Sequence, residues 1–271
     1  MQRERRKKGK KGMKLKFMEE RDNYIKVVIE GTTPDFANAI RRTLIADVPK
    51  LAIENVTIYD NTSALFDEII AHRLAMIPLP TDLDVMVPRS ECSCGGEGCP
   101  NCVVHYTLSK EGECTVYSGD LKAEEPSWAV KDEKIPIVRL LKDQRIILEA
   151  EAELGTGKEH AKWQTASGVG YSYYPEIEIT DDCDGCMDCV KACPRGILEV
   201  KRGKVVVKNI EDCSICKSCS DVCSKDAIKV RGNPNKIIFH FETDGSLTAR
   251  RAFIEALNIL HKKYDELEKA L

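Results

Sequence analysis

Residues 183–194, CDGCMDCVKACP, and residues 213–224, CSICKSCSDVCS, are two copies of one cysteine pattern, thirty residues apart. Each copy has the spacing C-x2-C-x2-C-x3-C, which is typical of a region that holds two iron–sulfur clusters. Three closely spaced thiolates can ligate one 4Fe–4S cluster, while the fourth cysteine of each copy reaches the other cluster. The spacing therefore predicts two ligand sets, which are Cys183, Cys186, Cys189 and Cys223, and Cys193, Cys213, Cys216 and Cys219.

The two copies differ in the residue that follows the fourth cysteine. Pro194 follows it in the first copy and Ser224 in the second, so the chain that leaves Cys223 is less constrained. A 3Fe–4S cluster at one site is therefore an alternative to a second 4Fe–4S cluster. Zinc, which favours paired C-x2-C knuckles, or disulfides, which need an oxidising compartment, would also explain the cysteines.

The composition bounds the class of protein. The 271 residues allow two or three domains, and the net charge of −3 gives no general sign of a nucleic-acid binder. No apolar run approaches the ~20 residues that span a bilayer, and no hydrophobic segment of a secretory signal follows the basic N-terminus. Thirteen cysteines without such a signal indicate a reducing compartment. We expect a cytoplasmic protein with no membrane partner.

The N-terminal segment 1–12, MQRERRKKGKKG, is strongly basic. It carries seven Lys or Arg residues against a single acid, Glu4. A charge run of this kind predicts a disordered leader. A contact with nucleic acid or with an acidic partner is the alternative, which we expect to be minor.

The chain before residue 50 predicts a hairpin and a helix. Residues 13–31 alternate apolar and polar side chains around an Asp22-Asn23 turn, which is typical of a β-hairpin. Thr33 is suited to cap a helix over residues 34–48, and Pro49 prevents its continuation. The apolar face of this helix consists of Phe36, Ile40 and Leu44.

Residues 51–179 indicate a mostly β region. A strand is predicted over 51–58, a short helix over 67–75, and a strand–turn–strand over 136–155. Residues 155–175, GTGKEHAKWQTASGVGYSYYP, are rich in glycine and poor in aliphatic side chains, so they predict a long loop. Within it, we interpret His160 and Trp163 as a polar loop contact to a partner rather than as catalytic groups.

The cysteine-rich region 180–232 interrupts a further element. Strand patterns precede it in EIEIT (176–180) and follow it in KIIFHF (236–241). The chain then ends in a predicted helix, capped by Ser246 or Thr248, with apolar residues spaced as in heptads: Phe253, Leu257, Leu260, Tyr264, Leu267 and Leu271. Such a stripe predicts packing on another helix, in this chain or in a partner.

A second group of cysteines lies in residues 92–102, CSCGGEGCPNC. Four thiolates within so short a segment, Cys92, Cys94, Cys99 and Cys102, suit a tetrahedral zinc ion, and three glycines allow the backbone to turn tightly around it. With all four positions occupied by thiolates, zinc here would be structural. Iron, or a loop that binds nothing, is the alternative.

The sequence contains no recognisable catalytic motif. A phosphate-binding G-x4-G-K-[ST] loop, a dinucleotide-binding G-x-G-x-x-G motif and a close aspartate cluster for two magnesium ions are all missing. The five histidines are scattered, without a telling spacing to Cys or Ser. We expect no active site of the chain's own.

Several stretches together resemble one family. The run RRTLIADVPKLAIENVTIYDNTSALFDEIIAHRLAMIPLP (41–80) is similar to the signature of the α-like subunits of RNA polymerase. The segments CSCGGEGCPNCVVHYTLS (92–109), VYSGDL (116–121) and GKEHAKWQ (157–164) resemble further stretches of the archaeal and eukaryotic members. From Met13 to its C-terminus, the chain resembles the archaeal members that contain a two-cluster ferredoxin-like domain.

This resemblance implies an α+β fold with a split dimerisation domain. Residues 13–50 and 233–271 would form that domain, a sheet plus two helices. Residues 51–179 would form an inserted mostly-β domain with a zinc loop at 92–102, and residues 180–232 a ferredoxin-like domain with two 4Fe–4S clusters.

The resemblance also implies a role as an assembly subunit of DNA-directed RNA polymerase. The chain would pair with the small subunit L and bind the large catalytic subunits, with subunits N and P nearby. The residues implied at the contact with L are Phe36, Ile40, Leu44, Phe253, Leu257, Leu260 and Tyr264. The clusters would stabilise or tune assembly. Rival interpretations are an electron-transfer protein of the ferredoxin type and a direct nucleic-acid-binding module.

Overall fold

The computed structural model describes residues 12–271, so the prediction of a disordered leader lies, up to residue 11, outside the described residues. The chain folds into two compact units. Among the described residues, one contains 12–19, 26–38 and 170–240, and the other contains 20–25, 39–169 and 241–271. In the part of the chain described, no helix is both long and apolar enough to cross a bilayer.

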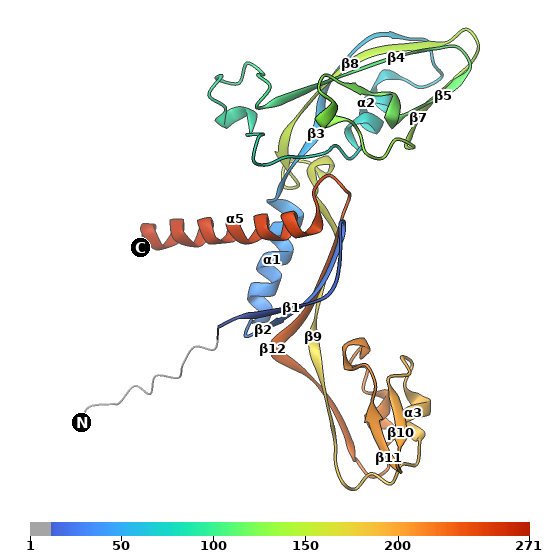
Figure 1. Cartoon of the computed structure of the whole chain (residues 1–271), viewed down its shortest axis with the longest axis vertical. Helices are drawn as coiled ribbons and strands as arrows, with labels where there is room; N and C mark the ends of the chain where they lie inside the picture. Colours follow the sequence, from blue (N-terminus) through green and yellow to red (C-terminus); the bar gives the residue numbers. More distant parts are fainter. Residues whose placement is uncertain (1–11) are drawn as a thin grey trace. The chain divides into compact units, whose positions relative to one another are not determined.

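A four-stranded sheet joins segments that are far apart in the sequence (Figure 1). Its strands are β1 (Lys14–Arg21), β2 (Tyr24–Glu30), β12 (Ile228–Thr243) and β9 (Ala166–Ile179), in the order β1-β2-β12-β9. This order confirms the hairpin predicted at residues 13–31 and the strands predicted before and after the cysteine-rich region. Thr180 N donates to Ala227 O at 2.9 Å, so the inserted segment begins and ends at neighbouring points.

One prediction in this region is wrong. The composition of residues 155–175 predicts a loop, but β9 occupies their second half. The glycines of this stretch weaken its strand signal. Its backbone groups are satisfied by neighbouring β12, a partner that lies more than fifty residues further along the chain.

The helices α1 (Pro34–Ala46) and α5 (Ala249–Ala270) begin at the residues expected from the sequence. The Thr33 side chain accepts from Phe36 N at 3.4 Å, and the Thr248 side chain accepts from Arg251 N at 3.2 Å. Each cap satisfies a backbone N–H that has no partner inside the helix. On α5, the Phe253 ring packs on Phe241, with 6.1 Å between the ring centroids.

A second sheet has the order β3-β8-β4-β6. Its strands are β3 (Pro49–Asn61), β8 (Arg145–Thr156), β4 (Val103–Glu111) and β6 (Lys122–Ala123). Helix α2 (Asp67–Ala75) contacts β3 and also β7 (Pro136–Leu140), which pairs with β5 (Cys114–Tyr117). These elements enclose a large apolar core that includes Ile70, Tyr106 and Leu148. The strands and the helix predicted in this region are confirmed.

The segment that contains His160 and Trp163 packs closely against this second sheet. Trp163 is buried, and its indole Nε1 donates to Glu153 O at 3.1 Å. The adjacent Lys162 is also buried; its ammonium group pairs with Glu54, donates to Ile53 O at 3.0 Å and lies 4.2 Å from the Trp163 ring centroid. The interpretation of Trp163 as a partner contact is therefore wrong, since its side chain anchors this segment to β3 and β8.

The substitution Gly155→Ala tests this anchor. A Cβ on Gly155 would lie 2.4 Å from ring carbons of Trp163, so the indole would have to move. We expect the free energy of unfolding to fall by about 1–3 kcal/mol, as in other overpacked sites. Urea unfolding, followed by tryptophan fluorescence, measures the change.

The control is Gly12→Ala, because a Cβ there meets no atom within 4 Å. That variant should unfold at the midpoint of the parent protein. Equal midpoints for Gly155→Ala and Gly12→Ala would show that the indole is not held where the structure places it.

Candidate metal centres

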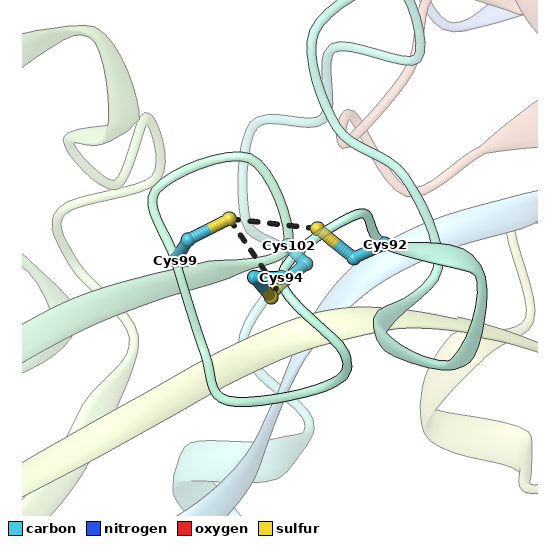
Figure 2. A group of neighbouring side chains, drawn as sticks. All are labelled: Cys92, Cys94, Cys99 and Cys102. Carbon is cyan, nitrogen blue, oxygen red and sulfur yellow. Dashed lines mark hydrogen bonds between the residues drawn. The ribbon is translucent and has the colours of Figure 1, made fainter.

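The loop between α2 and β4 gathers four sulfur atoms (Figure 2). The Sγ atoms of Cys92 and Cys99 lie 3.4 Å apart, those of Cys94 and Cys102 3.7 Å, and those of Cys99 and Cys102 3.9 Å. All four lie within 4.8 Å of one another, so this group could hold a metal ion. The loop brings together the four cysteines that the sequence singled out.

Local backbone geometry explains how the loop converges. Gly95, Gly96 and Gly98 have φ angles of 72°, 87° and 98°, a region that L side chains rarely adopt. Gly95 N donates to Cys92 O at 3.0 Å and Cys102 N donates to Cys99 O at 2.9 Å, so a tight turn follows the first cysteine of each pair. The Arg89 guanidinium donates to Gly96 O at 2.9 Å and approaches Glu153 of β8 at 3.4 Å, which fixes the loop to the sheet.

The sulfur separations match the size of a single tetrahedral ion. Thiolates at about 2.3 Å from zinc, with tetrahedral angles between them, lie about 3.8 Å from one another. The observed distances of 3.4, 3.7 and 3.9 Å bracket that value. Four thiolate ligands leave no coordination position for water, so a metal here would serve the fold rather than a reaction.

The loop also makes one of its thiols acidic. Backbone N–H groups of Cys99 and then Gly98 lower the pKa of Cys94 to about 5, because they stabilise its thiolate. Burial raises the pKa of Cys102 to about 12. A bound cation would oppose that second effect, since metal binding deprotonates its thiol ligands.

The second cysteine-rich region repeats its backbone as well as its sequence. Helix α3 (Asp188–Ala192) and helix α4 (Ser218–Asp221) each contain the third cysteine of a copy, and β10 (Leu198–Lys201) pairs with β11 (Lys204–Val207) between them. Positive φ angles recur thirty residues apart, at Gly185 and Ile215, Met187 and Lys217, and Gly196 and Asp226. A left-handed conformation costs a non-glycine residue about 1–2 kcal/mol, so the structure around these residues must hold the strained backbone.

Two cavities lie in this region, and each is lined by four cysteines. The first is lined by Cys183, Cys186, Cys189 and Cys223. The second is lined by Cys193, Cys213, Cys216 and Cys219. These are the two ligand sets predicted from the cysteine spacing, because the fourth cysteine of each copy lines the cavity that holds the first three cysteines of the other copy. An all-thiolate lining of this kind suits iron–sulfur clusters or zinc.

Few large side chains stabilise this region. Apart from cysteine, its buried apolar core contains only Ile197, Leu198, Val205, Ile228 and Val230 among the described residues. Burial raises the pKa of the Cys189 and Cys219 thiols, while a hydrogen bond from the Ser218 side chain lowers the pKa of Cys216. The sulfur atoms therefore lie in an apolar setting, in which an unligated thiol would stay protonated at its buried positions.

The cavities also contain charged residues that the sequence analysis did not single out. Asp184 and Lys225 line the first cavity, and Arg195 and Lys217 line the second. A comparison of the two copies position by position could have found them, because Arg195 and Lys225 are thirty residues apart.

The apolar stripes expected to contact a partner are divided by burial. Ile40 and Leu44 are 1% and 0% exposed, so their side chains lie in the chain's own core and are not available to a partner. Phe253 and Leu260 are also buried, whereas Phe36 and Leu257 are partly exposed. Beyond Leu260 the side chains of the stripe are exposed to solvent: Tyr264 is 54%, Leu267 57% and Leu271 101% exposed.

Comparisons with known proteins agree over nearly the whole chain. The family described as the RNA polymerase Rpb3/Rpb11 dimerisation domain matches residues 26–264. A DNA-directed RNA polymerase subunit Rpo3 from Archaeoglobus fulgidus is 46% identical over 257 residues, which cover 95% of this chain and 97% of the relative. The Rpo3 subunits of Methanosarcina acetivorans (45% identical, 94% and 97% covered) and Thermoplasma volcanium (42%, 96% and 99%) are similar over comparable lengths.

The acidity of Cys94 gives a test of the loop geometry. In chelator-treated protein, the pKa of about 5 leaves Cys94 as a thiolate throughout pH 6–8, so its alkylation by iodoacetamide should be nearly independent of pH there. An ordinary thiol such as glutathione should react about tenfold faster per pH unit over the same range. Peptide mass spectrometry gives both rates. A Cys94 rate that rises with pH as glutathione does would contradict the N–H contacts of this loop.

Proposed function

The chain belongs to the RNA polymerase Rpb3/Rpb11 dimerisation family, and we propose from this that it is the α-like assembly subunit of an archaeal DNA-directed RNA polymerase. The observation that carries the proposal is a family match over residues 26–264, which contain α1, most of α5, and the strands on both sides of the cysteine-rich insertion. The subunit contributes structure to a nucleotidyltransferase complex, and the catalytic groups belong to other subunits. Its place in the cell is then the cytoplasm, where transcription takes place.

The partner at the dimer contact is a small subunit of the L/Rpb11 type. The exposed part of α5 supports this assignment, since Tyr264, Leu267 and Leu271 lie on one helical face and are more than half exposed in the part of the chain that the structure describes. A helix with such a face is stabilised when a partner helix packs along it. The contact surface on α5 therefore consists of Leu257, Tyr264, Leu267 and Leu271.

The β-rich region presents a further surface to the large catalytic subunits. On and beside α2, three apolar side chains are exposed: Phe66 at 78%, Ile69 at 45% and Met76 at 49%. They lie inside the stretch 41–80 that resembles the family signature, and exposed apolar groups that cluster on one short element are typical of interaction sites. Subunits N and P are proposed as neighbours, and direct contact with DNA as minor.

The cysteine sites hold structural metal. We assign one zinc ion to Cys92, Cys94, Cys99 and Cys102, because the sulfur separations fit a single tetrahedral ion. One 4Fe–4S cluster is assigned to each of the two cavities, because each is lined by four thiols and three lie close together in sequence. Bound clusters supply the cross-links that the small apolar core of this region lacks, and they can also accept single electrons.

An electron-transfer protein of the ferredoxin type is the less favoured candidate. It accounts for residues 183–223 alone. The zinc loop, the exposed stripe of α5 and the similarity over about 95% of the chain to polymerase subunits then have no explanation. Any electron uptake by the clusters therefore serves or regulates the assembly subunit.

Leu267→Glu tests the dimer contact. The side chain is 57% exposed in the isolated chain, so the variant should fold, but a partner that buries this position would meet a carboxylate. Loss of one buried leucine costs about 1.5–3 kcal/mol, which weakens pairing with the L-type subunit about 10- to 100-fold. Calorimetric titration with the purified L-type subunit measures the affinity.

Asn258→Glu is the matched control, because it adds the same charge to an exposed position of α5 that lies off the stripe. It should bind as the parent chain does. If Leu267→Glu binds as tightly as Asn258→Glu, the exposed stripe is not the dimer contact.

Paired cysteine variants test the cluster assignment. The parent chain should contain about eight iron atoms and one zinc ion when it is purified without oxygen. If ligation crosses between the copies, Cys183→Ala with Cys223→Ala removes one cluster and leaves about four irons. Cys183→Ala with Cys213→Ala removes both clusters, although each double variant lacks two thiols. Iron, sulfide and zinc analysis gives the counts.

Cys114→Ala is the control for thiol loss, since Cys114 lines neither cavity and should leave the iron count unchanged. The same proteins test the scaffold role. We expect the variant without clusters to lose the ordered structure of residues 180–232 and to bind the L-type subunit more weakly. Equal iron in both double variants would exclude crossed ligation.

A further inference from the structure

The two cavities differ in the charge of their linings. Asp184 and Lys225 line the first cavity and form an ion pair at 2.9 Å, so their charges cancel. Arg195 and Lys217 line the second cavity, which has no carboxylate in its lining. Neither of these two cations forms an ion pair with any residue in the range 12–271 that the structure describes.

The thirty-residue repeat shows that this difference is built into the sequence. Asp184, Met187 and Asp188 surround the second cysteine of the first copy. The equivalent residues of the second copy are Ser214, Lys217 and Ser218. Two carboxylates in one copy thus correspond to two hydroxyl groups in the other, and a thioether corresponds to an ammonium group. The two copies differ by three unit charges at these positions. Lys191 of the first copy corresponds to Asp221 of the second, which offsets two of these charges, but neither residue lines a cavity.

Hydrogen bonds to sulfur differ in the same sense. Ser214 and Ser218 lie two residues before and after Cys216, and their hydroxyl groups are able to donate hydrogen bonds to a sulfur atom. At the equivalent place in the first copy, Cys186 N donates to the Asp184 carboxylate at 3.2 Å. A carboxylate cannot donate to a thiolate, so the Cys186 sulfur lacks the side-chain donors that the Cys216 sulfur has.

Both differences favour reduction of the second site. One-electron reduction adds a negative charge to a cluster without breaking a bond, and nearby cations and hydrogen bonds to the sulfurs stabilise that charge. We propose that the cluster held by Cys193, Cys213, Cys216 and Cys219 has the higher reduction potential, and is the site that accepts an electron from a low-potential donor. This inference rests on the proposed loading of both cavities with clusters. The other cluster then stays oxidised over the range in which the first electron enters.

A potentiometric titration with dithionite, followed by EPR spectroscopy on the complex with the L-type subunit, tests the inference. The parent complex should show two one-electron steps. Lys217→Met gives the second copy the residue that the first copy has, and should lower only the higher potential. We expect a tenfold fall in the ratio of reduced to oxidised cluster at fixed potential, which corresponds to 59 mV for a one-electron couple. Low ionic strength is needed, because both cations are exposed and salt screens them.

Two further variants complete the experiment. Met187→Lys, the reciprocal change, should raise only the lower potential and so bring the two steps together. Lys262→Met, the same substitution as Lys217→Met but in α5, should move neither. Iron and sulfide counts on every sample distinguish failure of the proposed function from failure of this inference. A chain without clusters contradicts the proposed function. A fully loaded chain whose clusters titrate together, or whose higher step is unmoved by Lys217→Met, overturns the inference.

Discussion

The pairing of β9 with β12 is the constraint on which the rest of the structure depends. These strands stand on either side of the cysteine-rich insertion in the sequence. In the sheet, β9 is an edge strand that pairs with β12, and β12 also pairs with β2. Their pairing brings Thr180 and Ala227 together, so the insertion starts from a closed base rather than from two free ends. The hydrogen bonds of the sheet thus offset the entropy cost of closing a segment of this length, and only the residues within the insertion remain to be ordered.

The correct predictions from the sequence rest on local signals. The cysteine spacing, the caps at Thr33 and Thr248, and the helix over 67–75 each depend on residues a few positions apart. The wrong predictions concern residues whose structure depends on parts of the chain that are distant in sequence. Residues 166–175 form a strand because of a partner beyond the insertion, and Trp163 is buried because Gly155, on β8, leaves room for its ring. The sequence of an apolar helical face does not reveal what packs on it. Ile40 and Tyr264 were therefore both predicted as partner contacts, but Ile40 is buried in the chain's own core and Tyr264 is exposed.

The candidate metal sites illustrate the same limit at a finer scale. Both cysteine groups were visible in the sequence, but the size of what each encloses follows only from geometry. The loop 92–102 brings its sulfurs to within 4.8 Å, the scale of one ion, whereas the eight cysteines of residues 183–223 surround two cavities. The charges that line those cavities come from residues that look unremarkable singly. They become informative when the copies are aligned on their cysteines, because a repeat with equal ligands but unequal neighbours implies sites that are equal in structure and unequal in chemistry.

That inequality bears on why an assembly subunit would contain clusters at all. If the two sites were only structural cross-links, their surroundings would not need to differ, and one zinc ion in each would stabilise the fold as well as a cluster. The second copy instead replaces two carboxylates by hydroxyl groups and adds an ammonium group, and it keeps Ile215 and Lys217 in left-handed conformations that a glycine would adopt at less cost. A strained region with a small core is one whose order depends on its ligand. A cluster that changes its charge there can alter the stability of the fold around it, and through that fold the affinity for a partner.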